Sequence, residues 1–195
     1  MAFQQVVLAS GSRWRRELLM STGIAVCAVE SGVDEAAITA DDPVALARGR
    51  ARAKAERVAR EHRDALVIGA DQVVHLDGCV FGKPPDPDAH MAMLQSLRGR
   101  AHVLTTAVCV VVDGVSETFE EHSRVRVRAD VTDAEIRAYV ASGEARGCAG
   151  GYMVERRGAW LVEHVDGDWN NVIGLPIRAV VTHLRARGWR LPEAP

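Results

Sequence analysis

The sequence predicts an α/β fold, a mixed twisted sheet flanked by helices, and three observations support this prediction. Short apolar runs alternate with helix-like segments along most of the 195 residues. Asp113-Gly114, the strongest hairpin signal in the chain, joins two β-rich runs, so the sheet cannot be purely parallel. With 48% hydrophobic residues the chain can bury a proper core, and we expect residues 1–195 to form a single domain.

The first predicted elements are a strand, a turn and a helix within residues 6–22. An apolar strand leads to Ser10-Gly11-Ser12, and Ser12 is the natural N-cap of a helix that ends at Gly23. Arg13, Arg15 and Arg16 then fall in the first helical turn, where the helix dipole disfavours cations. Arginines beside free backbone N–H groups at a helix start suit a bound phosphate, although a solvated basic patch is the alternative.

The central part of the chain continues the alternation of strands and helices. We expect a strand at residues 24–29, a long helix at 43–62 opened by Asp41-Asp42-Pro43, and a buried strand at 65–70. Residues 73–76 continue extended to the turn Asp77-Gly78. A helix at 86–97 follows the turn Pro84-Pro85.

The last third of the chain begins with the hairpin strands at residues 102–112 and 115–128. A helix at 132–142 starts with the capping box Thr132-Asp133-Ala134-Glu135. Tyr152 and residues 159–165 are expected to be extended, residues 168–176 to form a polar loop, and residues 177–187 to form a final helix.

Composition excludes several classes of protein. A formal net charge of −2 gives no general attraction to nucleic acid. The four cysteines form no C-x-x-C pair, which argues against a zinc ribbon or a disulfide framework and favours a reduced cytoplasmic setting. We expect neither a signal peptide nor a membrane span, because no apolar run approaches eighteen residues.

Three side chains stand out as candidates for chemistry. Asp71 follows the apolar run Leu66-Val67-Ile68-Gly69-Ala70, at the predicted carboxyl end of a strand, where open α/β sheets bind ligands. Lys83 lies in a Gly-Lys-Pro loop, and Lys54 lies on the inner side of the long helix. With the arginine turn they would form a cationic cup around one carboxylate, suited to hydrolysing a polyphosphate with a divalent metal.

Six short motifs follow one another along most of the chain. They are Leu8-Ala9-Ser10-x-Ser12-x-x-Arg15-x-x-Leu18-Leu19, Ala70-Asp71-Gln72-Val73, Gly82-Lys83-Pro84, Thr105-Thr106, Ala149-Gly150-Gly151-Tyr152 and Asn171-Val172-Ile173-Gly174-Leu175-Pro176. In this order they resemble the motifs of the Maf family of nucleoside triphosphate pyrophosphatases. The agreement runs from about residue 6 to residue 188, which makes it far more specific than any one motif.

This resemblance implies a Maf/ITPase-like fold with two lobes around a central cleft, and a homodimer. It also implies attack at the α-phosphorus, releasing a nucleoside monophosphate and pyrophosphate, with Asp71 as the proton acceptor that activates water. A divalent cation, Mg²⁺ or alternatively Mn²⁺, would bind between the phosphates and Asp71, with help from Asp34. The triphosphate would be held by Ser10, Arg15, Lys54 and Lys83, with Ser12 and Arg16 as weaker candidates.

The resemblance also points to three specificity positions, which hold Trp14, Gln72 and Glu155 in this chain. This set resembles the branch that acts on 7-methyl-GTP. An indole face attracts a cationic methylguanine by about 0.5–2 kcal/mol, and the Glu155 carboxylate can accept hydrogen bonds from guanine. The structural alternatives are a core-packing Trp14 and a Glu155 paired with a neighbouring arginine.

Departures from the family pattern keep other functions open. Arg13 replaces a usual proline, residues 48–54 match the usual Arg-Leu-Ala-x-x-Lys-Ala poorly, and the loop at 167–171 resembles the pyrimidine branch. Roles for Arg48 and Arg50 therefore stay open. A dTTP/UTP pyrophosphatase is the first alternative, a nucleotide-binding regulator of cell division that does not turn over is the second, and nucleic-acid binding through residues 13–16 is the third.

Overall fold

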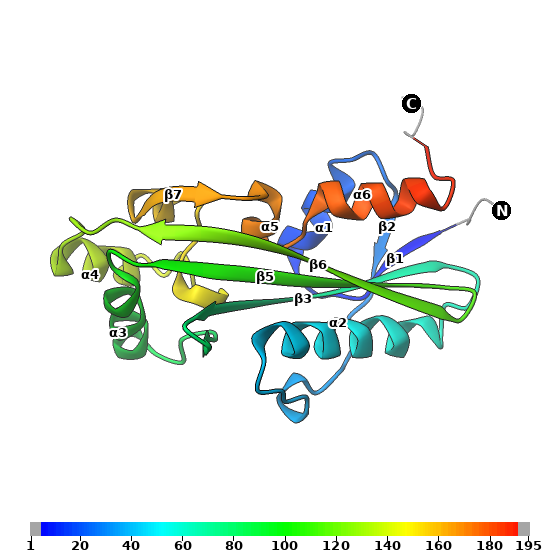
Figure 1. Cartoon of the computed structure of the whole chain (residues 1–195), viewed down its shortest axis with the longest axis horizontal. Helices are drawn as coiled ribbons and strands as arrows, with labels where there is room; N and C mark the ends of the chain where they lie inside the picture. The colour runs from blue at the N-terminus through cyan, green and yellow to red at the C-terminus, as the bar shows by residue number, and fades with distance from the viewer. Residues whose placement is uncertain (1–4, 191–195) are drawn as a thin grey trace.

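The computed structural model describes residues 5–190, and its centre is a seven-stranded mixed sheet (Figure 1). The strands lie in the order β2-β1-β3-β5-β6-β7, and β4 pairs with β3 beside this path. Their bounds are β1 Val6–Leu8, β2 Val26–Ala28, β3 Leu66–Leu76, β4 Cys79–Phe81, β5 Ala101–Val112, β6 Val115–Val127 and β7 Val162–Asp166. The predicted mixed α/β fold is confirmed.

The helices group toward the two ends of the long strands β3, β5 and β6, which gives the molecule its two lobes (Figure 1). α2 and α6 cover opposite faces of the sheet in one lobe, and α3 and α4 lie in the other. The helices are α1 Arg13–Met20, α2 Pro43–Ala59, α3 Pro87–Leu97, α4 Asp133–Ala141, α5 Trp169–Ile173 and α6 Ile177–Ala186, with 3-10 turns η1 Glu35–Ala37, η2 Ala149–Gly151 and η3 Arg157–Trp160. None of the helices in the described part of the chain is long and apolar enough to cross a membrane.

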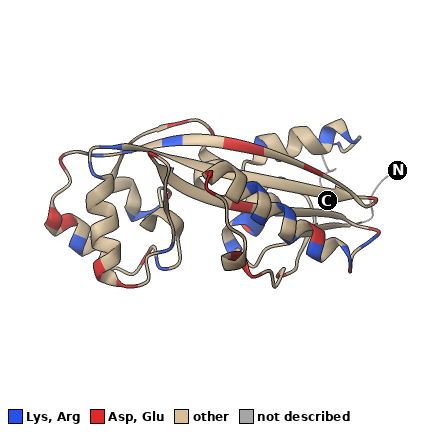
Figure 2. Ribbon diagram, turned by 60° about the horizontal axis from the view of Figure 1, so that its bottom comes forward, with Lys and Arg blue, Asp and Glu red and all other residues tan. Residues whose placement is uncertain are grey.

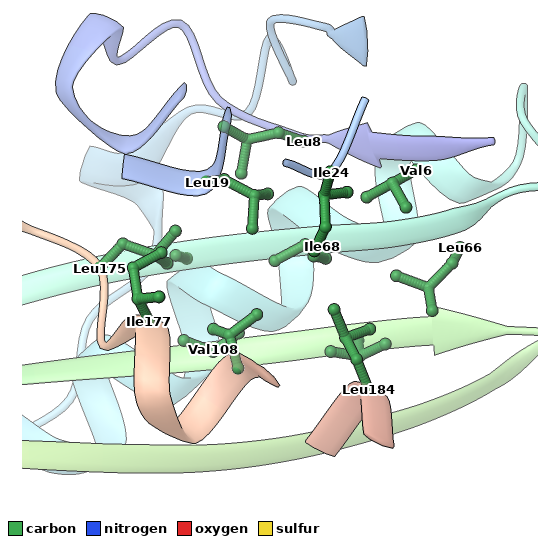
Figure 3. Packing of buried hydrophobic residues seen from close by; sticks show 13 residues of the cluster. Val6, Leu8, Leu19, Ile24, Leu66, Ile68, Val108, Leu175, Ile177 and Leu184 are labelled. Carbon is green, nitrogen blue, oxygen red and sulfur yellow. The ribbon is translucent and has the colours of Figure 1, made fainter. Parts of the chain in front are cut away.

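Strand alternation divides the core of the first lobe into two layers. Leu66 and Ile68 of β3 pack with α1 and α6 on one face, as Figure 3 shows (Figure 3). Val67 and Val73 point to the opposite face and pack against α2. The second lobe has its own apolar cluster, which includes Leu94 of α3. Burial on both faces explains why β3 reads as a continuous apolar run.

Gly69 lets α2 lie directly on β3. A Cβ at this position would stand 2.5 Å from the Ala51 carbonyl oxygen and 2.6 Å from the Ala55 backbone nitrogen. Both of these residues are fully buried alanines on the inner face of α2. The small residues on both elements therefore set a close helix-to-sheet approach, which brings the inner side of α2 to the neighbouring Asp71.

The two Asp-Gly turns adopt the conformation that tight hairpins need. Asp113 and Gly114 have φ of 49° and 76°, and Asp77 and Gly78 have φ of 50° and 80°. The first turn joins β5 to β6, as predicted. The second joins β3 to the short strand β4, which the sequence analysis did not identify.

The structure corrects three other sequence predictions. The two strands predicted at residues 65–70 and 73–76 are one strand, β3, which begins at Leu66, so Asp71 lies inside a strand and not at its carboxyl end. The predicted polar loop at 168–176 contains α5, because Asp168 caps that helix through the Asn171 backbone N–H. The first residues of the predicted strand at 159–165 form η3, and β7 begins at Val162.

Candidate active site

The pocket that brings the candidate residues together lies at an open stretch of the β3 edge. β1 pairs with β3 at residues 66–68, and β4 pairs with the same edge of β3 at residues 74–76. The residues between them have no strand partner on that side, within the part of the chain that the structure describes. The pocket that opens there has a volume of about 370 Å³ and is lined from both lobes, by α1, η1, α2, β3, the loop around Lys83, residues 147–155 and α5. This volume suits a small-molecule ligand.

Two neighbouring residues reach this pocket from opposite faces of β3. Asp71 points to the face covered by α2, whereas Gln72 points to the face on which α5 lies. Both line the pocket, because the open edge leaves it accessible from either face. The pocket therefore has a charged side against α2 and a second side against α5.

Lys54 connects two carboxylates on the charged side. Its ammonium nitrogen lies 2.6 Å from Asp71 Oδ1 and 2.9 Å from Glu35 Oε1. Lys54 and Asp71 are both buried, and Asp71 Oδ2 has no hydrogen-bond partner in the described chain. A buried carboxylate oxygen without a partner is costly. This oxygen therefore stands free to accept a proton or to bind a cation.

Arg15 is fixed at the open edge of β3 by two backbone carbonyls. Its Nε donates to the Gly174 oxygen at 3.0 Å, and its Nη1 donates to the Ala70 oxygen at 2.8 Å. Burial lowers the pKa of the Arg15 guanidinium from its ordinary value, against the opposing charges of Asp71 and Glu35. The remaining N–H groups of Nη1 and Nη2 can donate to an anion, which would also offset the cost of burying this charge.

Glu35 is surrounded by cations. Burial raises the pKa of its carboxyl, but the hydrogen bond and charge of Lys54 oppose that effect. The charges of Lys83 and Arg50 act in the same direction, so the pKa of Glu35 lies below its ordinary value. Glu35 is therefore a carboxylate at neutral pH, half-exposed at the mouth of the pocket.

The three proposed specificity residues, Trp14, Gln72 and Glu155, all line this pocket. The Gln72 amide nitrogen donates to the Asn171 carbonyl at 2.6 Å and to Thr106 Oγ1 at 3.0 Å. These contacts fix the orientation of the amide and leave its oxygen as an acceptor. The Arg156 guanidinium lies over the Trp14 ring, 5.0 Å from the ring centroid.

The structure also separates some of the predicted residues from the pocket. Ser12 lines it, but Ser10 does not, and the Ser10 hydroxyl instead accepts a hydrogen bond from the Ser12 backbone N–H. Asp34 does not line the pocket either, because its carboxylate accepts the Ala36 N–H and caps η1. Glu35, the next residue, lies beside Lys54 and lines the pocket, where we expected Asp34 to help hold a cation.

Of the arginines at the start of α1, only Arg15 enters the pocket. Arg16 is exposed and is not among the lining residues, and Arg13 pairs with Glu17 on the outer surface.

Sequence reasoning missed one charged residue of the pocket, Glu35, and left the role of a second, Arg50, open. The choice between Asp34 and Glu35 depends on which of them begins the 3-10 turn, and the local sequence does not show this. Arg50 had a usable signal, because it lies four residues before Lys54 and thus on the same side of α2.

The carboxylates present suit a divalent cation that arrives with a phosphate ligand. Among the described residues no three His, Cys, Asp or Glu side chains gather as a metal cage. Mg²⁺ is commonly held by one or two carboxylates together with substrate phosphates and waters. The unpartnered Asp71 Oδ2 and the Glu35 carboxylate, joined through Lys54, provide such a pair.

Comparison with known proteins agrees with this fold. A family model described as Maf-like protein matches residues 5–187. A protein of Oleidesulfovibrio alaskensis named dTTP/UTP pyrophosphatase is 41% identical over 193 residues, covering 96% of this chain and 87% of that protein. A protein of Synechococcus sp. named nucleoside triphosphate pyrophosphatase is 39% identical over 191 residues and 97% of each chain.

A solved structure of the Staphylococcus aureus Ham1 protein shares the fold, with a TM-score of 0.56 and 15% identity. The match covers 94% of this chain and all of that one. The family model and the relatives cover almost the whole chain, so the resemblance seen in the sequence motifs is confirmed: this chain belongs to the Maf family.

Proposed function

We propose that this chain is a nucleoside triphosphate pyrophosphatase, which hydrolyses the bond between the α- and β-phosphates and releases a monophosphate and pyrophosphate. The observation that carries the proposal is the buried Asp71 carboxylate, with one free oxygen, in a pocket that also presents Arg15, Lys54 and Lys83. The names of the relatives support the same reaction.

Asp71 would accept the proton of the attacking water through Oδ2, the oxygen that Lys54 leaves free. Lys54 holds the other oxygen and so fixes the direction of the carboxylate. Arg15 would bind phosphate oxygens through its free N–H groups, while the Ala70 and Gly174 carbonyls hold it in place. Positioning and charge neutralisation make up most of the catalysis that phosphoryl transfer needs.

The Glu35 carboxylate, with the neighbouring Asp71 carboxyl group, would hold a divalent cation, Mg²⁺ or Mn²⁺, together with the triphosphate. Such a cation would offset phosphate charge and polarise the phosphate oxygens. In this assignment Glu35 takes the role that the sequence resemblance gave to Asp34, because Asp34 caps η1.

We favour dTTP and UTP as substrates over 7-methyl-GTP. The relatives are named for the pyrimidine nucleotides. In addition, Arg156 already lies over the Trp14 ring, which weakens the attraction of that indole for a cationic base. The Gln72 oxygen can accept the N3–H group of thymine or uracil, because its amide nitrogen is fully occupied.

7-Methyl-GTP remains the second candidate, on one specific observation. Trp14 and Glu155 both line the pocket, and Glu155 has no hydrogen-bond or ion-pair partner among the described side chains. It is therefore not the surface partner of Arg156 or Arg157 that the alternative interpretation required. A free carboxylate suits the N1–H and N2–H groups of guanine.

The test is release of pyrophosphate from dTTP, UTP and 7-methyl-GTP by the purified protein, with and without Mg²⁺. We expect a nucleoside monophosphate and pyrophosphate in equal amounts, with higher kcat/KM for the pyrimidines. Release of orthophosphate alone would contradict the proposed bond. A clear preference for 7-methyl-GTP would make it the first substrate candidate in place of dTTP and UTP. The proposed reaction would stay the same.

The family resemblance further leads us to propose a homodimer and a cytoplasmic location. Light scattering on the purified protein distinguishes a dimer from a monomer. Microscopy of a tagged chain in its own cells tests the location.

A further inference from the structure

Three arginines alternate along α2, but only one of them faces the pocket. Arg48 pairs with Glu120, and Arg52 pairs with Glu56, both on exposed surfaces. Arg50 lies between them in sequence and lines the pocket with Lys54. Figure 2 shows how Lys and Arg recur along this helix (Figure 2).

The Arg50 guanidinium is anchored by one hydrogen bond, and its other donor groups lack partners in the described chain. Its Nε donates to the Glu35 backbone oxygen at 3.2 Å, and its two terminal nitrogens have no hydrogen-bond partner in the described chain. Arg50 is half-buried and lies four residues before Lys54, or about 6 Å along the helix axis. Its free N–H groups form the planar fork that binds phosphate oxygens in pairs.

The charges around Glu35 are unbalanced without a ligand. Lys54, Lys83 and Arg50 all act on this one carboxylate. In the whole pocket Arg15 adds a fourth cation, whereas Asp71 is the second carboxylate on the charged side. The excess of positive charge lies on the α2 side of β3, away from Gln72 and α5.

We propose that Arg50 binds the terminal phosphate of the substrate, so that this chain favours a triphosphate over shorter phosphate chains. The inference rests on the proposed function, which places the base near Gln72 and the reacting phosphorus at Asp71. The phosphates beyond the reacting one then extend past Lys54 toward Glu35, where Arg50 lies. Arg50 is thus a binding residue that the motif comparison did not assign.

The test compares Arg50→Gln with Arg52→Gln and Arg48→Gln, which remove the same charge from the same helix outside the pocket. For dTTP we expect Arg50→Gln to raise KM roughly tenfold, as one charged hydrogen bond implies, with kcat within about twofold. The affinity of Arg50→Gln for inorganic triphosphate, measured as competitive inhibition, should fall by the same factor. Its affinity for pyrophosphate should fall by much less. Arg50→Lys should lie between the wild type and Arg50→Gln, because it keeps the charge but loses the fork.

Equal KM values for Arg50→Gln and Arg52→Gln would overturn the inference. Equal losses of affinity for inorganic triphosphate and for pyrophosphate in Arg50→Gln would also overturn it. Failure of the proposed function gives a different result, namely a wild type that hydrolyses no nucleoside triphosphate. In that case, calorimetric binding of inorganic triphosphate to the wild type and to Arg50→Gln decides the inference. A tenfold difference supports it, and equal or absent binding contradicts it.

Discussion

Among single residues, Lys54 has the largest influence on the pocket, because one buried ammonium group serves two carboxylates. The same Lys54 nitrogen donates to the carboxylates of Asp71 and Glu35. Breaking a buried ion pair by removing one partner leaves the other charge uncompensated. Lys54 therefore fixes the orientation of the Asp71 carboxyl group through Oδ1 and leaves Oδ2 without a partner in the described chain.

His102 makes the stability of the fold depend on pH. Burial, with the nearby charge of His75, lowers the pKa of His102 to about 4 from an ordinary 6.5. Between these values the unfolded chain binds a proton that the folded chain excludes, so stability falls as the pH falls from 6.5 to 4. The total loss from this group is about 3 kcal/mol.

Denaturant unfolding at several pH values measures this effect. The wild type should lose stability steadily below pH 6.5, and His102→Gln should show a flatter profile over the same range. Because the substitution also disturbs the hydrogen bond to Tyr152, the slope and not the absolute stability is the decisive quantity. Parallel profiles for the two proteins would contradict the assignment.

Among the elements, the contact of α2 with β3 brings the charged groups together. Gly69→Ala would push a Cβ into the backbone of α2 at Ala51 and Ala55. We expect a loss of about 1–3 kcal/mol in the free energy of unfolding. The activity should also fall, because displacement of α2 moves Lys54 away from Asp71.

Gly82→Ala is the matched control for stability in thermal and denaturant unfolding. Its added Cβ meets nothing within 4 Å, and its φ does not lie in the left-handed region. If Gly69→Ala unfolds at the same denaturant concentration as Gly82→Ala, the close approach of α2 does not matter for stability.

α5 connects the two sides of the pocket. The Asn171 carbonyl accepts a hydrogen bond from the Gln72 amide. The Gly174 carbonyl, which follows directly after the helix, accepts one from Arg15 Nε. The fully buried Asn171 side chain fixes this segment to the sheet by donating to the Leu104 carbonyl and to Ser123 Oγ.

Asn171→Ala should therefore destabilise the protein by about 1–3 kcal/mol, the cost of removing the buried donor of the Leu104 carbonyl, whereas Ser123 Oγ keeps its hydrogen bond to the Asp168 carbonyl. It should also raise KM, because Gln72 and Arg15 lose their common support. Asn170→Ala is the control, since no hydrogen bond of that neighbouring side chain is found in the described structure. Unfolding curves and steady-state kinetics provide both readouts, and unchanged KM in Asn171→Ala would refute the support role.

Several elements could be predicted because their signals are local. The Asp113-Gly114 hairpin and the capping box of α4 both depend on residues within one turn. The interruption of the β3 edge could not be predicted, since it arises from where β1 and β4 stop pairing. For the same reason the sequence placed Asp71 at a strand end, although it lies inside β3.

At the scale of the whole molecule, the two lobes share three long strands and enclose the pocket between them. The sequence could predict the fold class and most pocket residues, because the motifs appear in chain order. It could not predict that Glu35, and not Asp34, lines the pocket, because this depends on how η1 sits against α2. The site is thus a product of the assembled lobes, not of any one motif.

The most direct test of the account compares Mg²⁺-dependent pyrophosphate release from dTTP by the wild type, Asp71→Asn and Asp34→Asn. Asp71→Asn removes the proposed proton acceptor, and we expect its kcat to fall by at least about 100-fold. Asp34→Asn keeps the cap of η1 outside the pocket, and its rate should stay close to that of the wild type. A wild type that releases no more pyrophosphate than Asp71→Asn across the nucleotide panel would contradict the central claim and favour a binding protein without turnover.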